Sequence, residues 1–182
     1  GIYTTNDEKY IITSSVDSTI RIINRESTLS QRNIVGNIKS VSQDNNLILI
    51  LDKDGNIKIY NFEKDEETTL GNISNSRFTT MINQYVISND GNYIGITDIS
   101  TATAQIMNRE GNILYTTKDH SQIDQYSVVQ DIAISETDQI LYTLGIKGEV
   151  YKTDLKTGEI LKTIKDKDEL GSYFVLSEDG SI

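Results

Sequence analysis

The sequence has no cysteine, no proline and no tryptophan, and its single histidine is His120. Without cysteine, these residues can form neither disulfide bonds nor thiolate metal sites, although the redox compartment stays undecided. Without a second histidine, they also lack the paired imidazole ligands of many metal centres. No stretch approaches the ~20 apolar residues that a membrane-spanning helix needs, so we expect no membrane insertion.

The charge is mainly of one sign. Asp and Glu outnumber Lys and Arg by 27 to 17, which gives a net charge of −10 and an isoelectric point near 4.5. Such a surface repels a phosphate backbone, so we expect no direct binding to nucleic acid. With 182 residues, 36% of them hydrophobic, the chain is long enough for one ordinary soluble domain. We expect an intracellular, cytoplasmic protein.

The segment Leu47–Asn61 has the pattern of a β-hairpin. Two apolar-rich runs flank Asp54-Gly55, and an Asp-Gly pair supplies the positive φ angles of a tight two-residue turn. Leu47–Leu51 is apolar throughout, which is typical of an inner strand buried on both faces. Asn56–Tyr60 mixes apolar and polar residues, so we expect it nearer the edge of its sheet.

The hairpin pattern occurs four times, at Tyr10–Asn24, Leu47–Asn61, Tyr93–Asn108 and Ile140–Asp154. From its first residue to the residue before the closing Asn or Asp, each copy spans 13, 13, 14 or 13 positions. A short strand is expected before each hairpin and another after it, with periods of 37, 46, 47 and 42 residues between units. The preceding strands are expected at Ile2–Tyr3, Ile38–Val41, Tyr85–Ser88 and Val128–Ser135, and the following ones at Thr28–Val35, Thr68–Ile73, Asn112–Thr117 and Glu159–Ile164.

Four strands in about 40 to 47 residues is the period of a β-propeller blade. The sequence therefore predicts an all-β fold, a β-propeller of four-stranded antiparallel blades, with about four and a half blades present. The single domain 1–182 divides approximately into blades 1–36, 37–76, 77–121 and 122–170. A fifth blade would start at 171–182, with a strand at Tyr173–Ser177. Because a half blade cannot close a ring, we expect the chain to be part of a longer protein.

The third strand of each unit resembles that of WD repeats, as a degenerate version that covers essentially the whole chain. In WD repeats an aspartate in the hairpin turn is followed six residues later by tryptophan and then aspartate. In DSTIRIIN and DGNIKIYN, Asp17 and Asp54 occupy the turn position, whereas Thr101 and Lys147 occupy it in the third and fourth units. The nearest match is the last unit, GEVYKTDLKTGEILKTI. The tryptophan positions hold Ile23, Tyr60, Met107 and Thr153.

This resemblance implies a non-catalytic protein-protein interaction scaffold within a larger multisubunit complex. We therefore expect protein partners, no enzymatic activity, no cofactor and no bound metal. The turn residues Asp17, Asp54, Thr101 and Lys147 would emerge together on one rim of the ring, which we predict to be the partner-binding surface. The connections around Ser74–Ser76 and Lys118–Gln125 would lie alongside.

His120 is the sole candidate for acid–base catalysis or imidazole coordination near neutral pH. In WD repeats a histidine in this connection forms a hydrogen-bonded set with a Ser or Thr, the turn aspartate and the tryptophan. Since no unit here has all four residue types, the full set cannot form. We expect His120 to be structural or exposed.

Two other interpretations stay open. Asp52-Lys-Asp54-Gly-Asn56 with Glu63 imitates the ligand spacing of a calcium loop, but Ile57 replaces the invariant glycine and a hairpin turn explains Asp54-Gly55. DLKTGEILKTI also resembles the repeats of quinone-binding propellers. The alternative function is therefore a propeller enzyme or small-ligand-binding propeller, with a quinone, sugar or metal in the central channel and its site in blades outside this segment.

Overall fold

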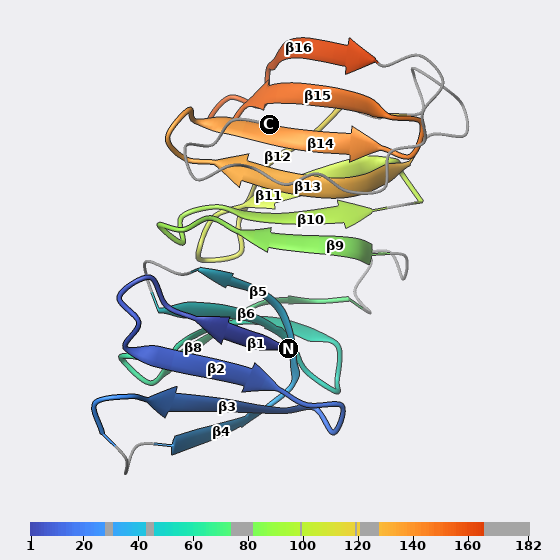
Figure 1. Cartoon of the computed structure of the whole chain (residues 1–182). Coiled ribbons are helices and arrows are strands. Elements are labelled where there is room, and N and C mark those ends of the chain that lie inside the picture. The colour runs from blue at the N-terminus through green and yellow to red at the C-terminus, as the bar shows by residue number, and fades with distance from the viewer. Residues whose placement is uncertain are drawn as a thin grey trace.

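The computed structural model describes residues 1–27, 31–42, 46–73, 82–98, 100–118, 120 and 128–165. The strands in these ranges form four separate antiparallel sheets of four strands each (Figure 1). We number these sheets blades 1 to 4 in chain order. The predicted all-β propeller class is thereby confirmed. No helix in the described ranges is long and apolar enough to cross a membrane.

The strands follow the chain in simple order within every blade. All four predicted hairpins and their flanking strands are found, with ends that differ from the predictions by a few residues. The predicted strand start at Thr28 and the predicted fifth blade at 171–182 lie outside the described residues. Blade 1 contains β1 (Ile2–Thr4), β2 (Tyr10–Ser14), β3 (Thr19–Asn24) and β4 (Gln31–Val35), and blade 2 contains β5 (Asn37–Ser42), β6 (Leu47–Leu51), β7 (Asn56–Asn61) and β8 (Glu66–Asn72). Blade 3 contains β9 (Ile82–Ile87), β10 (Ile94–Asp98), β11 (Thr103–Met107) and β12 (Ile113–Thr116), and blade 4 contains β13 (Val129–Ser135), β14 (Ile140–Gly145), β15 (Glu149–Asp154) and β16 (Ile160–Lys165).

The turn between β6 and β7 is longer than predicted. The Asp52 N–H donates to Asn56 O (3.0 Å) and the Gly55 N–H donates to Asp52 O (3.1 Å), so Lys53, Asp54 and Gly55 connect the paired positions. Within this turn only Gly55 has a positive φ, 81°. This is a type I turn followed by one left-handed residue. The prediction of a two-residue turn with two left-handed residues is therefore wrong.

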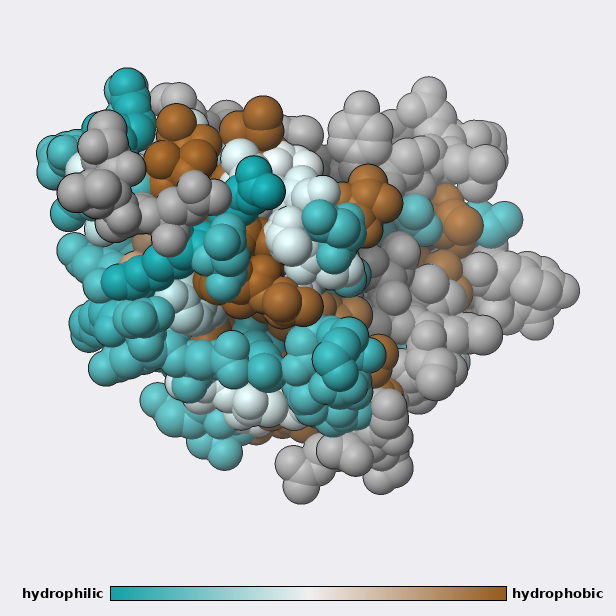
Figure 2. Space-filling view, turned by 90° about the horizontal axis from the view of Figure 1, so that it is seen from below, coloured by the Kyte–Doolittle hydropathy of each residue, from teal (hydrophilic) through white to brown (hydrophobic). Residues whose placement is uncertain are grey.

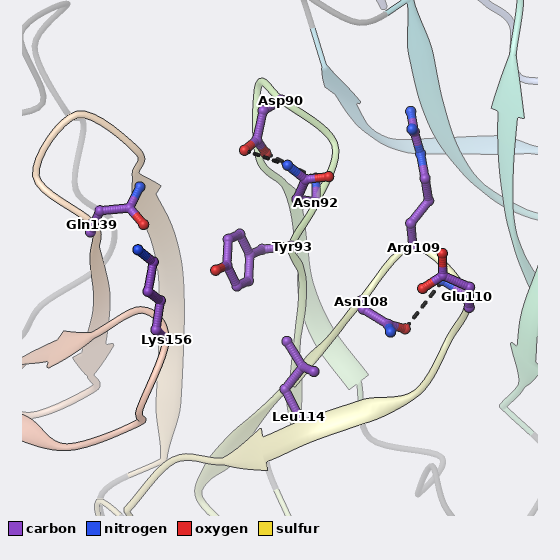
Figure 3. A pocket seen from close by; sticks show the side chains of 9 residues that line it. All are labelled: Asp90, Asn92, Tyr93, Asn108, Arg109, Glu110, Leu114, Gln139 and Lys156. Atoms are coloured by element: carbon purple, nitrogen blue, oxygen red, sulfur yellow. Dashed lines mark hydrogen bonds between the residues drawn. The ribbon is translucent and has the colours of Figure 1, made fainter.

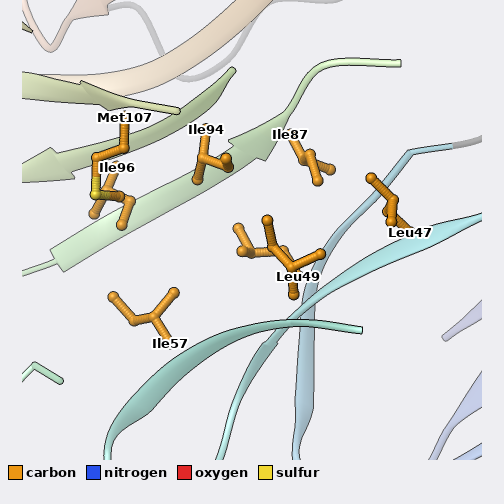
Figure 4. Close-up of a cluster of buried hydrophobic side chains, with 8 residues drawn as sticks. Leu47, Leu49, Ile57, Ile87, Ile94, Ile96 and Met107 are labelled. Atoms are coloured by element: carbon orange, nitrogen blue, oxygen red, sulfur yellow. The ribbon is translucent and has the colours of Figure 1, made fainter. Parts of the chain in front are cut away.

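The apolar core lies between the blades, and blade 2 is buried on both faces because it packs between blades 1 and 3. Leu47 and Leu49 of β6 face blade 3, whereas Ile48 and Ile50, which point to the other side of the strand, face blade 1. All four side chains are at most 1% exposed, so the prediction of a strand buried on both faces is confirmed. Figure 4 shows the contact of blade 2 with blade 3, in which Leu47, Leu49 and Ile57 face Ile87, Ile94, Ile96 and Met107.

Hydrogen bonds also join neighbouring blades. The Ser40 hydroxyl oxygen of β5 accepts the Ile87 N–H of β9 at 3.2 Å. The Asp90 N–H of blade 3 donates to both carboxylate oxygens of Glu136 in blade 4, at 3.0 and 3.1 Å. These bonds add directional contacts to the apolar packing, so the described blades have a defined relative position.

Blade 1 exposes apolar side chains. Ile2 is 77% exposed, Ile23 38% and Val35 61%. These residues alternate along their strands with the side chains that pack on blade 2, so they belong to the other face of the sheet. Seen from below, on the side of blades 1 and 2, the molecule has apolar side chains gathered near the middle and hydrophilic ones around them (Figure 2).

Candidate functional site

The four predicted partner-binding residues all lie in turns between the second and third strands of their blades. In Figure 1 the arrows of β2, β10 and β14 end on the same, right-hand side of the molecule. The turns that follow these strands therefore share one side of the stack of blades. We name the turns 15–18, 52–55, 100–102 and 146–148 the hairpin rim.

A left-handed residue follows each predicted site residue. Directly after the site residue comes Ser18 (φ 63°), Gly55 (φ 81°), Ala102 (φ 53°) or Gly148 (φ 79°). In three blades the carbonyl of this residue accepts an N–H from the connection that leaves the blade: from Gly36 at 2.7 Å, from Ile73 at 2.8 Å and from His120 at 2.9 Å. The turn and the connection are thus held together by their backbones.

Asp17 has an exposed carboxylate that folds back onto its own turn. Its Oδ1 atom accepts the Thr19 hydroxyl at 2.6 Å and the Thr19 N–H at 2.9 Å. These bonds from Thr19 stabilise the ionised form, which lowers the pKa of Asp17. Asp17 therefore presents a fixed negative charge on the rim.

Asp54 is exposed and forms an ion pair with its neighbour Lys53 at 3.0 Å. The bonding of the turn itself depends on Asp52, whose carboxylate accepts the Asp54 N–H, the Asn56 N–H and the Asn56 side-chain amide, each at 2.9 Å. Lys58 Nζ lies 3.2 Å from the same carboxylate. The hydrogen bond from the Asn56 side chain is the main cause of the lowered pKa of Asp52. The turn thus uses Asp52 and leaves Asp54 free to face solvent.

The acidic pattern Asp52–Asn56 therefore forms a hydrogen-bonded turn, because protein donors already occupy the oxygens of Asp52. In the part of the chain that the structure describes, no group of three or more His, Cys, Asp or Glu side chains is placed to hold a metal ion.

Thr101 and Lys147 complete the rim. Thr101 is exposed, and its hydroxyl lies 2.8 Å from that of Thr103 in the same hairpin. Lys147 is partly exposed and has no ion pair within 4.0 Å among the described acids. The rim therefore changes from negative charge at Asp17 and Asp54 to positive charge at Lys147. No described hydrogen bond or ion pair joins any two of the four residues, so they share a side of the molecule without forming one bonded cluster.

His120 is completely buried between blades 3 and 4. Its Nδ1 atom lies 3.2 Å from Oε1 of Glu149, and its Nε2 atom lies 2.8 Å from the Thr143 hydroxyl oxygen. The ring of Tyr151 packs beside the imidazole, with centroids 4.3 Å apart. The prediction that no blade has the full WD set of residue types holds, but blade 4 assembles a counterpart from other residues. In this cluster Glu149 supplies the carboxylate next to the imidazole, and Tyr151 contributes a ring contact.

The sequence pattern missed Glu149 and Tyr151 because neither is at the position that the repeat alignment assigned to the aspartate or the tryptophan. Glu149 lies two residues after the assigned aspartate position, and Tyr151 lies two residues before the assigned tryptophan position. The alignment pointed to Lys147 and Thr153, whereas the strand pairing sets Tyr151 directly opposite Thr143. The relevant signal was a glutamate at the start of a predicted strand, two residues before a tyrosine. Of the two connections predicted to lie beside the rim, Ser74–Ser76 and residues 119 and 121–125 are outside the described residues.

Comparison with solved structures supports the fold. The β-propeller domain of Cps50 (Swd1) from Myceliophteria thermophila matches with a TM-score of 0.72 and 14% identity, over 98% of this chain and 58% of that one. A chain of the Mitotic Checkpoint Complex matches with a TM-score of 0.68 and 14% identity, over 97% of this chain and 53% of that one. This chain thus spans a little over half the length of either. No family model matches the sequence, and no curated protein matches it. The predicted resemblance to a WD-like propeller is confirmed at the level of the fold.

Proposed function

We propose that this chain is a non-catalytic, WD-like propeller that acts as a protein-protein interaction scaffold within a larger multisubunit complex. Its partner surface would be the hairpin rim, with Asp17, Asp54, Thr101 and Lys147 at the tips of the turns. The proposal includes protein partners in place of nucleic acid and a cytoplasmic location.

One observation carries the proposal: in the turns of the hairpin rim the backbone groups are held by hydrogen bonds, whereas the side chains at the tips are exposed. The turns of blades 1, 2 and 4 have backbone hydrogen bonds within their hairpins, and the Ser100 N–H of blade 3 donates to the Asp98 side chain. In blades 1 to 3 the turn backbone also accepts a hydrogen bond from the outgoing connection. The side chains of Asp17, Asp54 and Thr101 remain exposed at the tips. Val16, beside Asp17, is fully exposed as well. Rigid turns with exposed tips can bind a partner without a large loss of conformational entropy.

Two further observations support protein partners. The net charge of −10 disfavours contact with phosphate backbones, and the rim carries charges of both signs, as complementary protein surfaces often do. One of the structurally similar chains is part of the Mitotic Checkpoint Complex.

The experiment that tests this proposal is affinity purification of the full-length protein from its native cell at low and at high salt. We expect a stoichiometric set of proteins, whose recovery falls at high salt because salt screens contacts between exposed charges. Recovery of the protein alone and monomeric would contradict the scaffold and would favour a search for small ligands in the channel.

A further inference from the structure

The outer edge of blade 3 differs from the outer edges of the other three described blades. Its strand β12 consists of Ile113, Leu114, Tyr115 and Thr116 and has no charged residue. Charged side chains on an edge strand hinder the addition of another strand. The other outer strands have such charges: Arg32 in β4, Glu66 and Glu67 in β8, and Lys162 in β16.

β12 is also exposed and suited to strand pairing. Ile113 is 41% exposed and Leu114 46%. β12 ends the sheet order of its blade, and among the described strands it pairs only with β11, with a register shift between Ile113 and Tyr115. On either side of this shift, backbone N–H and C=O groups point away from the sheet. Ile113, Tyr115 and Thr116 have high β-propensity, and Ile113 and Leu114 add an exposed apolar surface. The strand therefore offers a template for a further strand.

The position of β12 is fixed by contacts on its other sides. The Tyr115 hydroxyl donates to Leu155 O in blade 4 at 3.0 Å. The Tyr115 ring packs closely on Gly158, where an added Cβ would lie 2.7 Å from the ring. Burial of Tyr115 raises the pKa of its hydroxyl, so this donor keeps its proton at neutral pH. A preformed edge of this kind needs little ordering when a partner binds.

A hollow of about 560 Å³ between blades 3 and 4 adjoins this strand through Leu114. Tyr93 of blade 3 and Gln139 and Lys156 of blade 4 line it, and in Figure 3 the ends of these three side chains point toward one another. Lys156 forms no ion pair within 4.0 Å with the described acids. Asp90, which also lines the hollow, already accepts hydrogen bonds from Ser88 and Asn92. An acidic side chain could therefore enter next to Lys156.

We propose that an extended peptide segment of another protein adds to the outer edge of β12 as a fifth strand of blade 3. Its aliphatic side chains pack on Ile113 and Leu114, and an acidic side chain at one end pairs with Lys156 in the hollow. In this mode of recognition the backbone hydrogen bonds supply affinity and the side-chain pockets supply specificity. The site is separate from the hairpin rim and does not depend on the function proposed for it.

The test uses random peptides displayed on phage and selected on the full-length protein. A selected peptide is synthesised with a fluorescent label, and its Kd is measured by anisotropy. We expect alternating aliphatic residues next to an acidic one, and a loss of affinity of at least about tenfold in Leu114→Lys and in Lys156→Glu. The matched controls are Leu161→Lys, at a 56% exposed aliphatic position of β16, and Lys162→Glu, both with a change below about twofold.

Hydrogen exchange on the wild-type protein gives a measurement that needs no variant. Bound peptide should slow exchange in β12 and leave β4, β8 and β16 unchanged. Selected peptides without the aliphatic and acidic pattern, protection elsewhere, or equal affinity of Leu114→Lys would overturn the proposal. Self-association of the wild type that Leu114→Lys abolishes would show that a second copy occupies the edge, and would overturn it too.

Discussion

The Nδ1 atom of His120 lies 3.2 Å from Oε1 of Glu149, and neither side chain is exposed to solvent. His120 belongs to the connection that follows blade 3, whereas Glu149 begins β15 of blade 4. Since His120 also contacts the Thr143 hydroxyl and donates its backbone N–H to Ala102 O, one residue joins two blades. The buried cluster therefore has a structural role, because it connects blades 3 and 4. This role requires the histidine to be buried.

Loss of either partner in this pair should destabilise the fold. We expect His120→Ala and Glu149→Ala each to lower the free energy of unfolding by about 3 kcal/mol, because each removes the contact between two fully buried polar side chains. The measurement is urea denaturation followed by circular dichroism. Lys147→Ala, two residues before Glu149 and partly exposed, is the control and should change stability by at most about 0.5 kcal/mol. If the loss of stability in the double variant His120→Ala/Glu149→Ala equals the sum of the two single losses, the two residues do not interact directly.

The carboxylate of Asp52 should make stability depend on pH. Its hydrogen bonds, first of all with the Asn56 side chain, lower its pKa in the folded state below the usual 3.8 of an aspartate. The stability from this group is therefore fully present above pH ~4 and is lost as the pH falls toward the folded pKa. We expect Asp52→Asn to lower the urea midpoint at neutral pH and to have a smaller effect in strong acid.

The control for this measurement is Asp54→Asn, because Asp54 is exposed and pairs only with its neighbour Lys53 among the described ion pairs. Its effect on the midpoint should be small at both pH values. An Asp52→Asn effect that grows as the pH falls would have the wrong sign for a lowered pKa and would refute this assignment.

Ser18 has the left-handed conformation that glycine occupies in blades 2 and 4. A residue with a side chain pays about 1–2 kcal/mol of strain in this conformation. Glycine avoids this strain, but part of the gain is lost because glycine has more conformational freedom in the unfolded chain. We expect Ser18→Gly to raise the free energy of unfolding by about 0.5–1 kcal/mol. Conversely, Gly55→Ala should lower it by about 1–2 kcal/mol, since its Cβ would also lie 2.9 Å from Ile73. Thermal unfolding of both variants tests this, and stabilisation by Gly55→Ala would contradict it.

The sequence was sufficient to predict the hairpins because their signals are local. Asp54-Gly55 marks a turn, and the burial of Leu47–Leu51 on both faces follows from its uninterrupted apolar run. The repeat spacing then placed turns in blades 1, 3 and 4 that have weaker local signals. Neither Ser18 nor Ala102 is a residue that usually indicates a left-handed conformation, yet both adopt it at the repeated position.

The buried cluster could not be predicted in the same way because it depends on distance in space. His120 and Glu149 meet only after blade 4 packs on blade 3. The repeat alignment instead placed Lys147 at the turn position and Thr153 at the tryptophan position. The protein-binding role of Asp17, Asp54, Thr101 and Lys147 stays a prediction. Their position in the turns follows from the repeat, but the identity of a partner depends on chemistry outside this chain.

The most direct test of the scaffold account is binding of the double variant Asp54→Lys with Lys147→Glu to the partners that co-purify with the wild type. We expect an affinity loss of at least about tenfold, or ~1.4 kcal/mol, because the charges at two tips of the rim are reversed. The melting temperature should change by less than about 2 °C, since both side chains lie at the surface. The control, Glu26→Lys with Lys64→Glu, makes the same charge changes at two exposed positions outside the rim and should keep wild-type affinity. Unchanged binding of the rim variant, or its unfolding, would contradict the account.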